Sequence, residues 1–256
     1  ALALNKQYLV DRVENGGAIP TNHIVPRGMP GYFPGLLTPG SNPTQSLTGN
    51  QAEAVQLLKA AQATCATNDP VTGKPPAECP FITGAHPAPI TINVSAGNQT
   101  RVAIAEAAKD QWNSVLGLNI QVAAVRPDQF GPNIVPRGPY QVWILGWLAD
   151  YPDPQDWLSL QFTSNPPNAT SSNNTADIRD PNLDALFKQA DVEQDPAKRM
   201  GLYNQAEQMV INEVPWIPYE QAKALWRMRP WVRGFGLNSV GLMVDIAWPN
   251  VAIASH

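Results

Sequence analysis

Residues 90–125 read "ITINVSAGNQTRVAIAEAAKDQWNSVLGLNIQVAAV", and this stretch decides the fold class. It opens with apolar and polar side chains in alternation, as in a half-buried strand, and residues 119–125 alternate in the same way. Between them lie apolar residues at helical spacing, with Asn98 as the expected cap of a helix and Gly117 as its stop. A strand, a helix and a strand with short links form a βαβ unit, so the sequence predicts an α/β fold.

The next apolar segment runs directly into a group of acidic residues and prolines. Residues 140–147, "YQVWILGW", are apolar on both faces, which predicts a central strand of the sheet. Residues 148–154, "LADYPDP", follow at once. Asp153 lies between prolines as in a turn, and Asp156 is typical of the first turn of a helix. Asp150 is left as a carboxylate beside an indole at the end of a strand, a combination that can serve as a binding site.

The segments before this unit have a different character. Apolar residues at helical spacing within residues 2–13 predict a first helix that begins before residue 1, and we expect the chain to be a fragment. Residues 16–45 contain so much proline and glycine that they exclude a helix or a central strand. Residues 50–62 read as a short amphipathic helix.

Two more helices are expected in the second half, each opened by Asp-Pro. Residues 180–181 and 195–196 both place a capping carboxylate before a proline at the first helical position. Residues 214–226 and 230–236 read as closing strands. The side chains expected to face the core from the two helices are Leu183, Leu186, Phe187, Ala190, Leu202, Ala206, Met209 and Val210.

Composition limits the possible classes of function. The chain has 256 residues, 43% hydrophobic and 15% charged, enough for one large domain or two unequal ones. A net charge of -4 gives no sign of a nucleic-acid-binding surface. Cys65 and Cys79 are separated by 14 positions, with a polar, flexible segment between them. They form either a disulfide, which would indicate an oxidising compartment, or two unpaired thiols.

Enzyme chemistry finds little support in the sequence. His23, His86 and His256 are scattered without metal-ligand spacing, so neither a metal site nor a cofactor is expected. Asp150 and Asp153 could supply the acid and base of a secreted hydrolase, and this alternative stays open. No side chain with the setting of an activated nucleophile accompanies them, so we expect a binding protein with no catalytic residue.

Four blocks of the chain, in order, resemble the family 5 extracellular solute-binding proteins, the oligopeptide and dipeptide receptors of ABC importers. The most characteristic block is "WILGWLADYPDPQDWLSLQF", residues 143–162. The other three are residues 1–32, 98–122 and 180–219. The resemblance implies the C-terminal lobe of a two-lobed receptor of the periplasmic-binding-protein type II kind, with a mixed sheet flanked by helices. It implies a ligand-binding lobe at residues 1–232, and a return segment at residues 233–256 that packs on a missing N-terminal half.

The resemblance also implies roles for three residues. Asp150 matches an aspartate that pairs with the N-terminal ammonium of a bound peptide, whereas Trp147 and Tyr219 match aromatic residues that line the cleft. Each of the three could instead be structural, as a turn cap or as core. Leu148 stands where the oligopeptide receptors often carry a cysteine, so the loop between Cys65 and Cys79 would replace their local disulfide.

The implied ligand is a short peptide, with an oligosaccharide or another small solute as the alternative. Residues 141–145 offer no arginine for a ligand carboxylate, which leaves the preferred peptide length open. The implied partners are the permease subunits of an ABC importer and the N-terminal half of the same protein. The implied location is extracytoplasmic, in the periplasm or on the outer face of the cell membrane, with a lipid anchor on the full-length protein.

Overall fold

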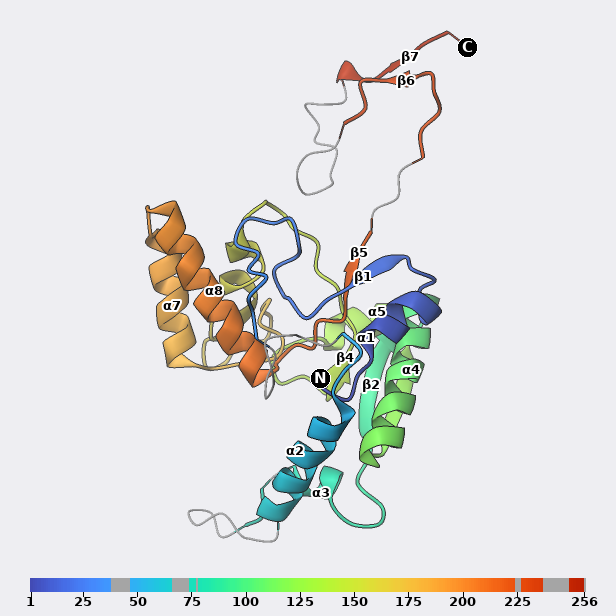
Figure 1. Cartoon of the computed structure of the whole chain (residues 1–256), viewed down its shortest axis with the longest axis vertical. Helices are drawn as coiled ribbons and strands as arrows, with labels where there is room; N and C mark the ends of the chain where they lie inside the picture. Colours follow the sequence, from blue (N-terminus) through green and yellow to red (C-terminus); the bar gives the residue numbers. More distant parts are fainter. Residues whose placement is uncertain (38–46, 66–73, 77, 224–226, 237–248, 256) are drawn as a thin grey trace.

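A computed structural model of the chain describes residues 1–37, 47–65, 74–76, 78–223, 227–236 and 249–255 (Figure 1). The predicted βαβ unit is present as β2 (Ile90–Ser95), α4 (Gln99–Leu116) and β3 (Ile120–Val125), and its two strands pair in parallel. The side chain of Asn98 accepts the backbone N–H of Arg101, and Gly117 ends α4 in the left-handed conformation. The α/β fold predicted from this stretch is therefore confirmed.

The prediction of a central strand over residues 140–147 is wrong. β4 spans only Val142–Trp143 and pairs with one side of β2, so that β2 holds the centre of the sheet and β4 lies at an edge. Beyond Trp143 the chain leaves the sheet, and Leu145 and Leu148 are exposed to solvent. An apolar pattern on both faces shows that side chains avoid water but does not show which partner covers them.

The other strands in the described part of the chain form two antiparallel ribbons. β1 (Ala18–Pro20) pairs with β5 (Glu220–Ala222), and β6 (Val232–Arg233) pairs with β7 (Ala252–Ile253). Figure 1 shows the second ribbon standing apart from the body of the molecule. The boundary that we expect between residues 232 and 233 stays a prediction.

The largest core lies under two long helices. α7 (Pro181–Val192) and α8 (Pro196–Glu213) begin at the Asp180 and Asp195 caps, as predicted, and pack side by side (Figure 1). The 3-10 turn η3 (Pro154–Asp156) and α6 (Ser159–Phe162) contact them from the loop after β4. Of the eight side chains predicted to face the core, Leu183, Phe187, Ala190, Ala206 and Val210 are buried, and Leu186, Leu202 and Met209 pack against the cluster.

The N-terminal segment starts differently from the prediction. The first helix begins at Lys6, not before residue 1, because the side chain of Asn5 caps it by accepting the N–H of Tyr8. α1 (Lys6–Tyr8) continues directly into a π-helical turn, η1 (Leu9–Val13), which packs on α4. Leu2 therefore precedes the helix.

A fully buried carboxylate organises part of the proline-rich tract that follows. One oxygen of Glu207, on α8, accepts the backbone N–H groups of Ile24 and Val25 at 2.8 and 3.0 Å. A tract with few strand or helix partners needs such acceptors for its buried backbone. Burial raises the pKa of Glu207 to about 7, and burial lowers the pKa of the adjacent His23 to about 4.

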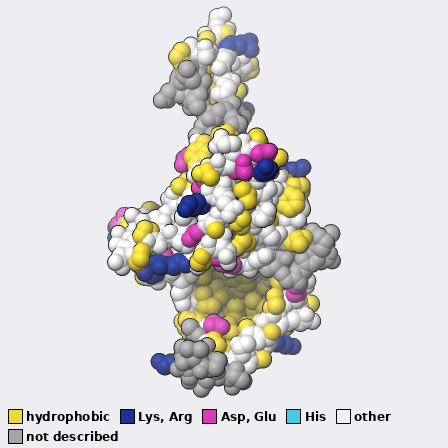
Figure 2. Space-filling view, turned by 90° about the vertical axis from the view of Figure 1, so that its left-hand side faces the viewer, with side chains coloured by type: hydrophobic (Ala, Val, Ile, Leu, Met, Phe, Trp, Pro, Cys, Tyr) yellow, Lys and Arg dark blue, Asp and Glu magenta, His cyan; other side chains and the backbone are white. Residues whose placement is uncertain are grey.

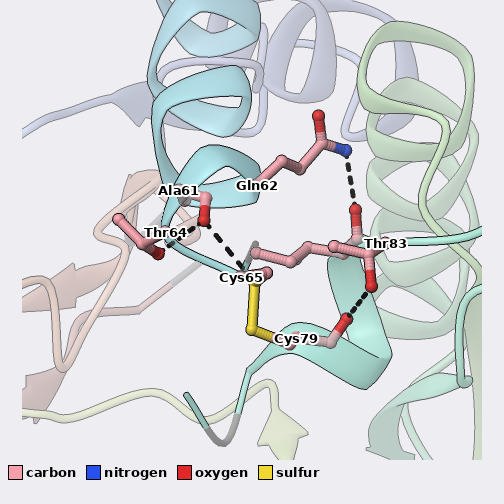
Figure 3. The surroundings of a disulfide bond; sticks show 7 residues. Ala61, Gln62, Thr64, Cys65, Cys79 and Thr83 are labelled. Carbon is pink, nitrogen blue, oxygen red and sulfur yellow. Dashed lines mark hydrogen bonds between the residues drawn. A yellow bond between two sulfur atoms is a disulfide. The ribbon is translucent and has the colours of Figure 1, made fainter. Parts of the chain in front are cut away.

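The two cysteines form the predicted disulfide. Cys65 caps α2 (Gln51–Thr64) and Cys79 opens α3 (Cys79–Ile82), with their Cα atoms 5.6 Å apart (Figure 3). The side-chain amide of Gln62 donates to the carbonyl of Ile82 at 2.6 Å, so the two helices are also joined by a hydrogen bond. The remaining described helices are α5 (Pro127–Phe130) and the 3-10 turn η2 (Gly131–Asn133).

The surface of the body is not uniform. Figure 2 shows a hollow with a hydrophobic floor between the main body and the lower end of the molecule, where α2 and α3 lie in Figure 1. Charged side chains are spread over the outer surface around it. Within the described part of the chain, no helix has the length and apolarity that a membrane crossing requires.

Candidate ligand-binding site

The candidate site lies in the loop that follows β4, at residues 144–156, which we call the site loop. β2 and β4 are parallel, so the site loop and the first turn of α4 lie at the same edge of the sheet, beyond the carboxyl ends of the strands. Open α/β sheets bind their ligands at this edge. The N–H of Ile144 still donates to the carbonyl of Asn93 at 3.2 Å, which ties the start of the loop to the sheet.

Asp156 is the internal anchor of the site loop. Its side chain is fully buried, and its Oδ2 atom accepts the indole N–H of Trp147 at 3.1 Å and the backbone N–H of Asp150 at 3.2 Å. Its Oδ1 atom is buried without a hydrogen-bond partner among the described residues. Burial raises the pKa of Asp156, while these two hydrogen bonds act in the opposite direction.

Asp150 differs from Asp153 and Asp156, the other two acids of the site loop, because its side chain faces solvent. The residue is exposed, and within the described part of the chain its carboxylate makes neither a hydrogen bond nor an ion pair. Its backbone is held by Asp156, so the carboxylate projects from a fixed point of the loop. Trp147 is half-buried, with the polar edge of its ring turned toward Asp156.

Asp153 has a structural partner. Its two carboxylate oxygens each accept a hydrogen bond from one terminal nitrogen of Arg199 on α8, at 2.7 and 2.9 Å. The oxygen Oδ1 also accepts the backbone N–H of Gln155. A carboxylate held in this way by a guanidinium is a poor general base. The hydrolase alternative that pairs Asp150 with Asp153 therefore loses one of its two groups.

Tyr219 lies apart from these acids, in the apolar cluster beneath α4. It is half-buried and packs with Leu4, Leu9 and Ile144, and its hydroxyl donates to Glu220 at 3.0 Å. Burial raises its pKa. Ile144 links this cluster to the start of the site loop, but among the described residues no hydrogen bond joins Tyr219 to Trp147 or Asp150.

Glu14, Glu220 and Arg101 form a second polar group beside the site loop, which the sequence did not suggest. Burial and the facing carboxyl of Glu220 raise the pKa of Glu14 to about 8, whereas the positive charge of Arg101 lowers it. A Cβ atom added to Gly146 would lie 2.5 Å from the Arg101 guanidinium, so the glycine lets that group lie against the loop. Arg101 comes from the first turn of α4.

Metal-binding groups are not found in the described part of the chain, where no cluster of three or more His, Cys, Asp or Glu has the required arrangement. His23 is buried, its ring lies tilted at 48° against the ring of Tyr32, and its Nδ1 atom is 3.8 Å from Glu207. His256 lies outside the described residues.

The spacing of the three acids was the signal for Asp156. Asp150, Asp153 and Asp156 recur at every third residue, so three nearby carboxylates had to be accommodated in one short loop. The position of Asp156 in η3 agrees with the first helical turn expected for it. The burial of its side chain, and the two N–H groups that it accepts from the loop, have no local sequence signal.

Comparison with known proteins gives a consistent result. A profile of the bacterial extracellular solute-binding proteins, family 5, middle region, matches residues 1–169. The chain is 25% identical over 243 residues to the periplasmic murein peptide-binding protein MppA of Escherichia coli K12, covering 93% of this chain and 39% of that protein. It is 34% identical over 101 residues to the di/tripeptide-binding protein 4 of Pseudomonas aeruginosa, covering 40% of this chain and 19% of that protein.

Solved structures share the fold. The structure of OppA from Burkholderia pseudomallei aligns with a TM-score of 0.73 at 21% identity, over 100% of this chain and 44% of that one. The chain thus spans less than half the length of the relatives that it matches.

Proposed function

Because the chain belongs to the family 5 bacterial extracellular solute-binding proteins, we propose that it captures short peptides for an ABC importer. In this proposal residues 1–232 form the C-terminal, ligand-binding lobe of a two-lobed receptor. The ligand is held between this lobe and an N-terminal half, and the closed receptor delivers it to permease subunits in the membrane. The matched family consists of binding proteins, and we assign no catalytic residue.

The observation that carries the proposal is the state of Asp150. Its carboxylate is exposed and without a partner among the described residues, at the edge of the sheet where ligands bind, while the loop beneath it is fixed. A peptide ammonium that is closed away from water needs a charged acceptor, and such a hydrogen bond contributes about 1.5–3 kcal/mol. Asp150 is available for this role, whereas Asp153 and Asp156 already have partners.

Other parts of the site fit an extended peptide. Leu145 and Leu148 are exposed on the site loop, 51% and 78%, so the loop that carries Asp150 also offers apolar surface for a ligand to cover. Pairing of the peptide backbone with the protein would give affinity without selecting side chains. We assign Trp147 to the wall of the cleft beside the peptide terminus and Tyr219 to its floor.

The size of the relatives supports a second lobe. The murein peptide-binding protein is more than twice as long as the matched region, since this chain covers 39% of it. Residues 233–256 would return to that second lobe, which agrees with the position of the β6–β7 ribbon away from the body (Figure 1). Closure between two lobes would bury most of the ligand surface.

The proposed location is extracytoplasmic, in the periplasm or on the outer face of the membrane with a lipid anchor. The family description places its members outside the cell, and the disulfide between Cys65 and Cys79 suits an oxidising compartment. The proposed location and the proposed lipid anchor both refer to the full-length receptor.

The test is binding of blocked and free peptides to the full-length receptor that carries these residues. Calorimetric titration with Ala-Ala-Ala, Ala-Ala-Ala-Ala and a mixed tripeptide library should give saturable binding. The N-acetylated forms, which lack the ammonium but keep every other group, should bind at least about tenfold more weakly. Equal affinity for both forms would remove Asp150 from its role. Binding of oligosaccharides but not of peptides would replace the proposed ligand class.

A further inference from the structure

Asp156 connects the two residues that are proposed to meet the ligand. The donors on its Oδ2 atom come from Trp147 and Asp150, nine and six residues earlier in the chain. One donor is the side chain of the cleft aromatic residue, and the other is the backbone of the ammonium acceptor. A single buried oxygen thus fixes both members of the site relative to each other.

We infer that Asp156 is the positioning residue of the peptide site, which holds Asp150 and Trp147 in their binding arrangement without touching the ligand. The inference rests on the proposed function for its ligand, but the geometry that it explains does not depend on which solute binds. Asp156 is fully buried, whereas Asp150 is exposed, so the two carboxylates of one loop have separate tasks.

The physical reason is preorganisation. From Ile144 to Asp150 the chain belongs to neither a helix nor a strand, and it contains Gly146, so the free loop would sample many conformations. An ordered loop avoids the entropy that would otherwise be lost when the ligand binds, and affinity rises accordingly. Asp156 is well suited to this task because it is itself anchored. It lies in η3, and η3 packs against α8.

The chain offers a matched control in Glu207. Like Asp156 it is fully buried, one of its oxygens accepts two N–H groups, and the other has no partner in the described part of the chain. Its donors are Ile24 and Val25, outside the site loop. A general effect of removing a buried carboxylate should therefore be seen in both variants, and a positioning effect only at Asp156.

The first arm of the test measures the loop itself in the full-length receptor without ligand. Hydrogen exchange and nitrogen–proton spectra are recorded for the Trp147 indole N–H and the Asp150 amide in wild type, Asp156→Ala, Asp156→Asn and Glu207→Ala. Asp156→Ala should lower the protection of both protons by about tenfold, as expected for one lost hydrogen bond each. Asp156→Asn keeps an acceptor oxygen and should lower it less. If Asp156→Ala does not fold, Asp156→Asn provides the measurement in its place.

The second arm titrates the same proteins with Ala-Ala-Ala. Asp156→Ala should bind about tenfold more weakly, Asp156→Asn should recover part of that loss, and Glu207→Ala should stay within about twofold of wild type. The inference is overturned if the two protons keep their protection in Asp156→Ala, or if Glu207→Ala lowers their protection equally. It is also overturned if Asp156→Ala lowers their protection without weakening peptide binding. If wild type binds no peptide, the proposed function fails, while the first arm still decides whether Asp156 holds the loop.

Discussion

The guanidinium of Arg199 holds both carboxylate oxygens of Asp153, with N–O distances of 2.7 and 2.9 Å, and so ties the site loop to α8. Both side chains are only partly exposed, at 20% for Arg199 and 31% for Asp153. The hydrogen bond to Asp153 raises the pKa of Arg199. A two-point contact of this kind, together with the turn that Asp153 caps at Gln155, belongs to the more stabilising class of surface ion pairs.

We therefore predict that Asp153→Asn lowers the free energy of unfolding by about 1–2 kcal/mol, measured by denaturant titration. The control is Asp128→Asn, which breaks the Arg126–Asp128 pair. That pair is largely exposed, at 73% and 60%, and should change stability by less than about 0.5 kcal/mol. Equal losses in the two variants would show that the contact with Arg199 has no special weight.

Asp150→Asn should weaken binding of free tripeptides by about 2–5 kcal/mol, because the ammonium would be buried without a charged partner. Stability should change little, since the carboxylate has no partner among the described residues. Calorimetry with the full-length receptor measures the affinity, and Asp128→Asn again serves as the control. A loss smaller than about tenfold would argue that another group receives the ammonium.

The disulfide is expected to matter for stability and not for binding. Cys65 and Cys79 close a loop with a sequence separation of 14, far along the chain from the site loop. Replacing both by serine should lower the free energy of unfolding by roughly 3 kcal/mol, mainly through the freedom that the unfolded chain regains. Thermal melting with and without reductant measures this. If peptide affinity also falls by more than about threefold, the α2–α3 region contributes to the site.

The βαβ unit and the helices α7 and α8 were predictable because their signals are local. Asn98, Asp180 and Asp195 each accept a backbone N–H within their own first turn, and Gly117 adopts its left-handed conformation within its own helix. A cap depends on neighbours in the sequence, so spacing alone identifies it.

The extent of β4 and the burial of Asp156 were not predictable in the same way. Val142–Trp143 pair with only two residues of β2 before the chain turns away, although β2 itself continues to Ser95. The length of β4 therefore depends on the path of the loop that follows it. Asp156 is buried by packing of η3 against α6 and α8, which a local pattern does not record. The exposed Asp150 could be identified from a resemblance to a family, whereas the residue that holds it required the three-dimensional arrangement.

The buried carboxyl of Glu207 should leave a signature in the pH dependence of stability. Burial raises its pKa to about 7, so between about pH 4.5 and 7 the folded protein binds a proton that the unfolded chain has lost. The contribution of Glu207 to the free energy of unfolding is therefore greatest below about pH 4.5 and is lost as the pH rises to about 7. The adjacent His23 acts in the opposite sense. Burial and the charge of Lys6 lower its pKa to about 4, so its contribution to stability grows as the pH rises from about 4 to 6.5.

Glu207→Gln separates the two effects, because the amide keeps an acceptor for Ile24 and Val25 but does not titrate, while His23 remains in both proteins. We predict similar stabilities near pH 4.5. By pH 7.5 the variant should be more stable relative to wild type by about 2–3 kcal/mol, as expected for a carboxylate that must ionise in a buried site. Urea titrations at several pH values measure the difference. A difference that stays constant between pH 4.5 and 7.5 would mean that Glu207 is ionised throughout, with His23 or Lys6 supplying the compensating charge.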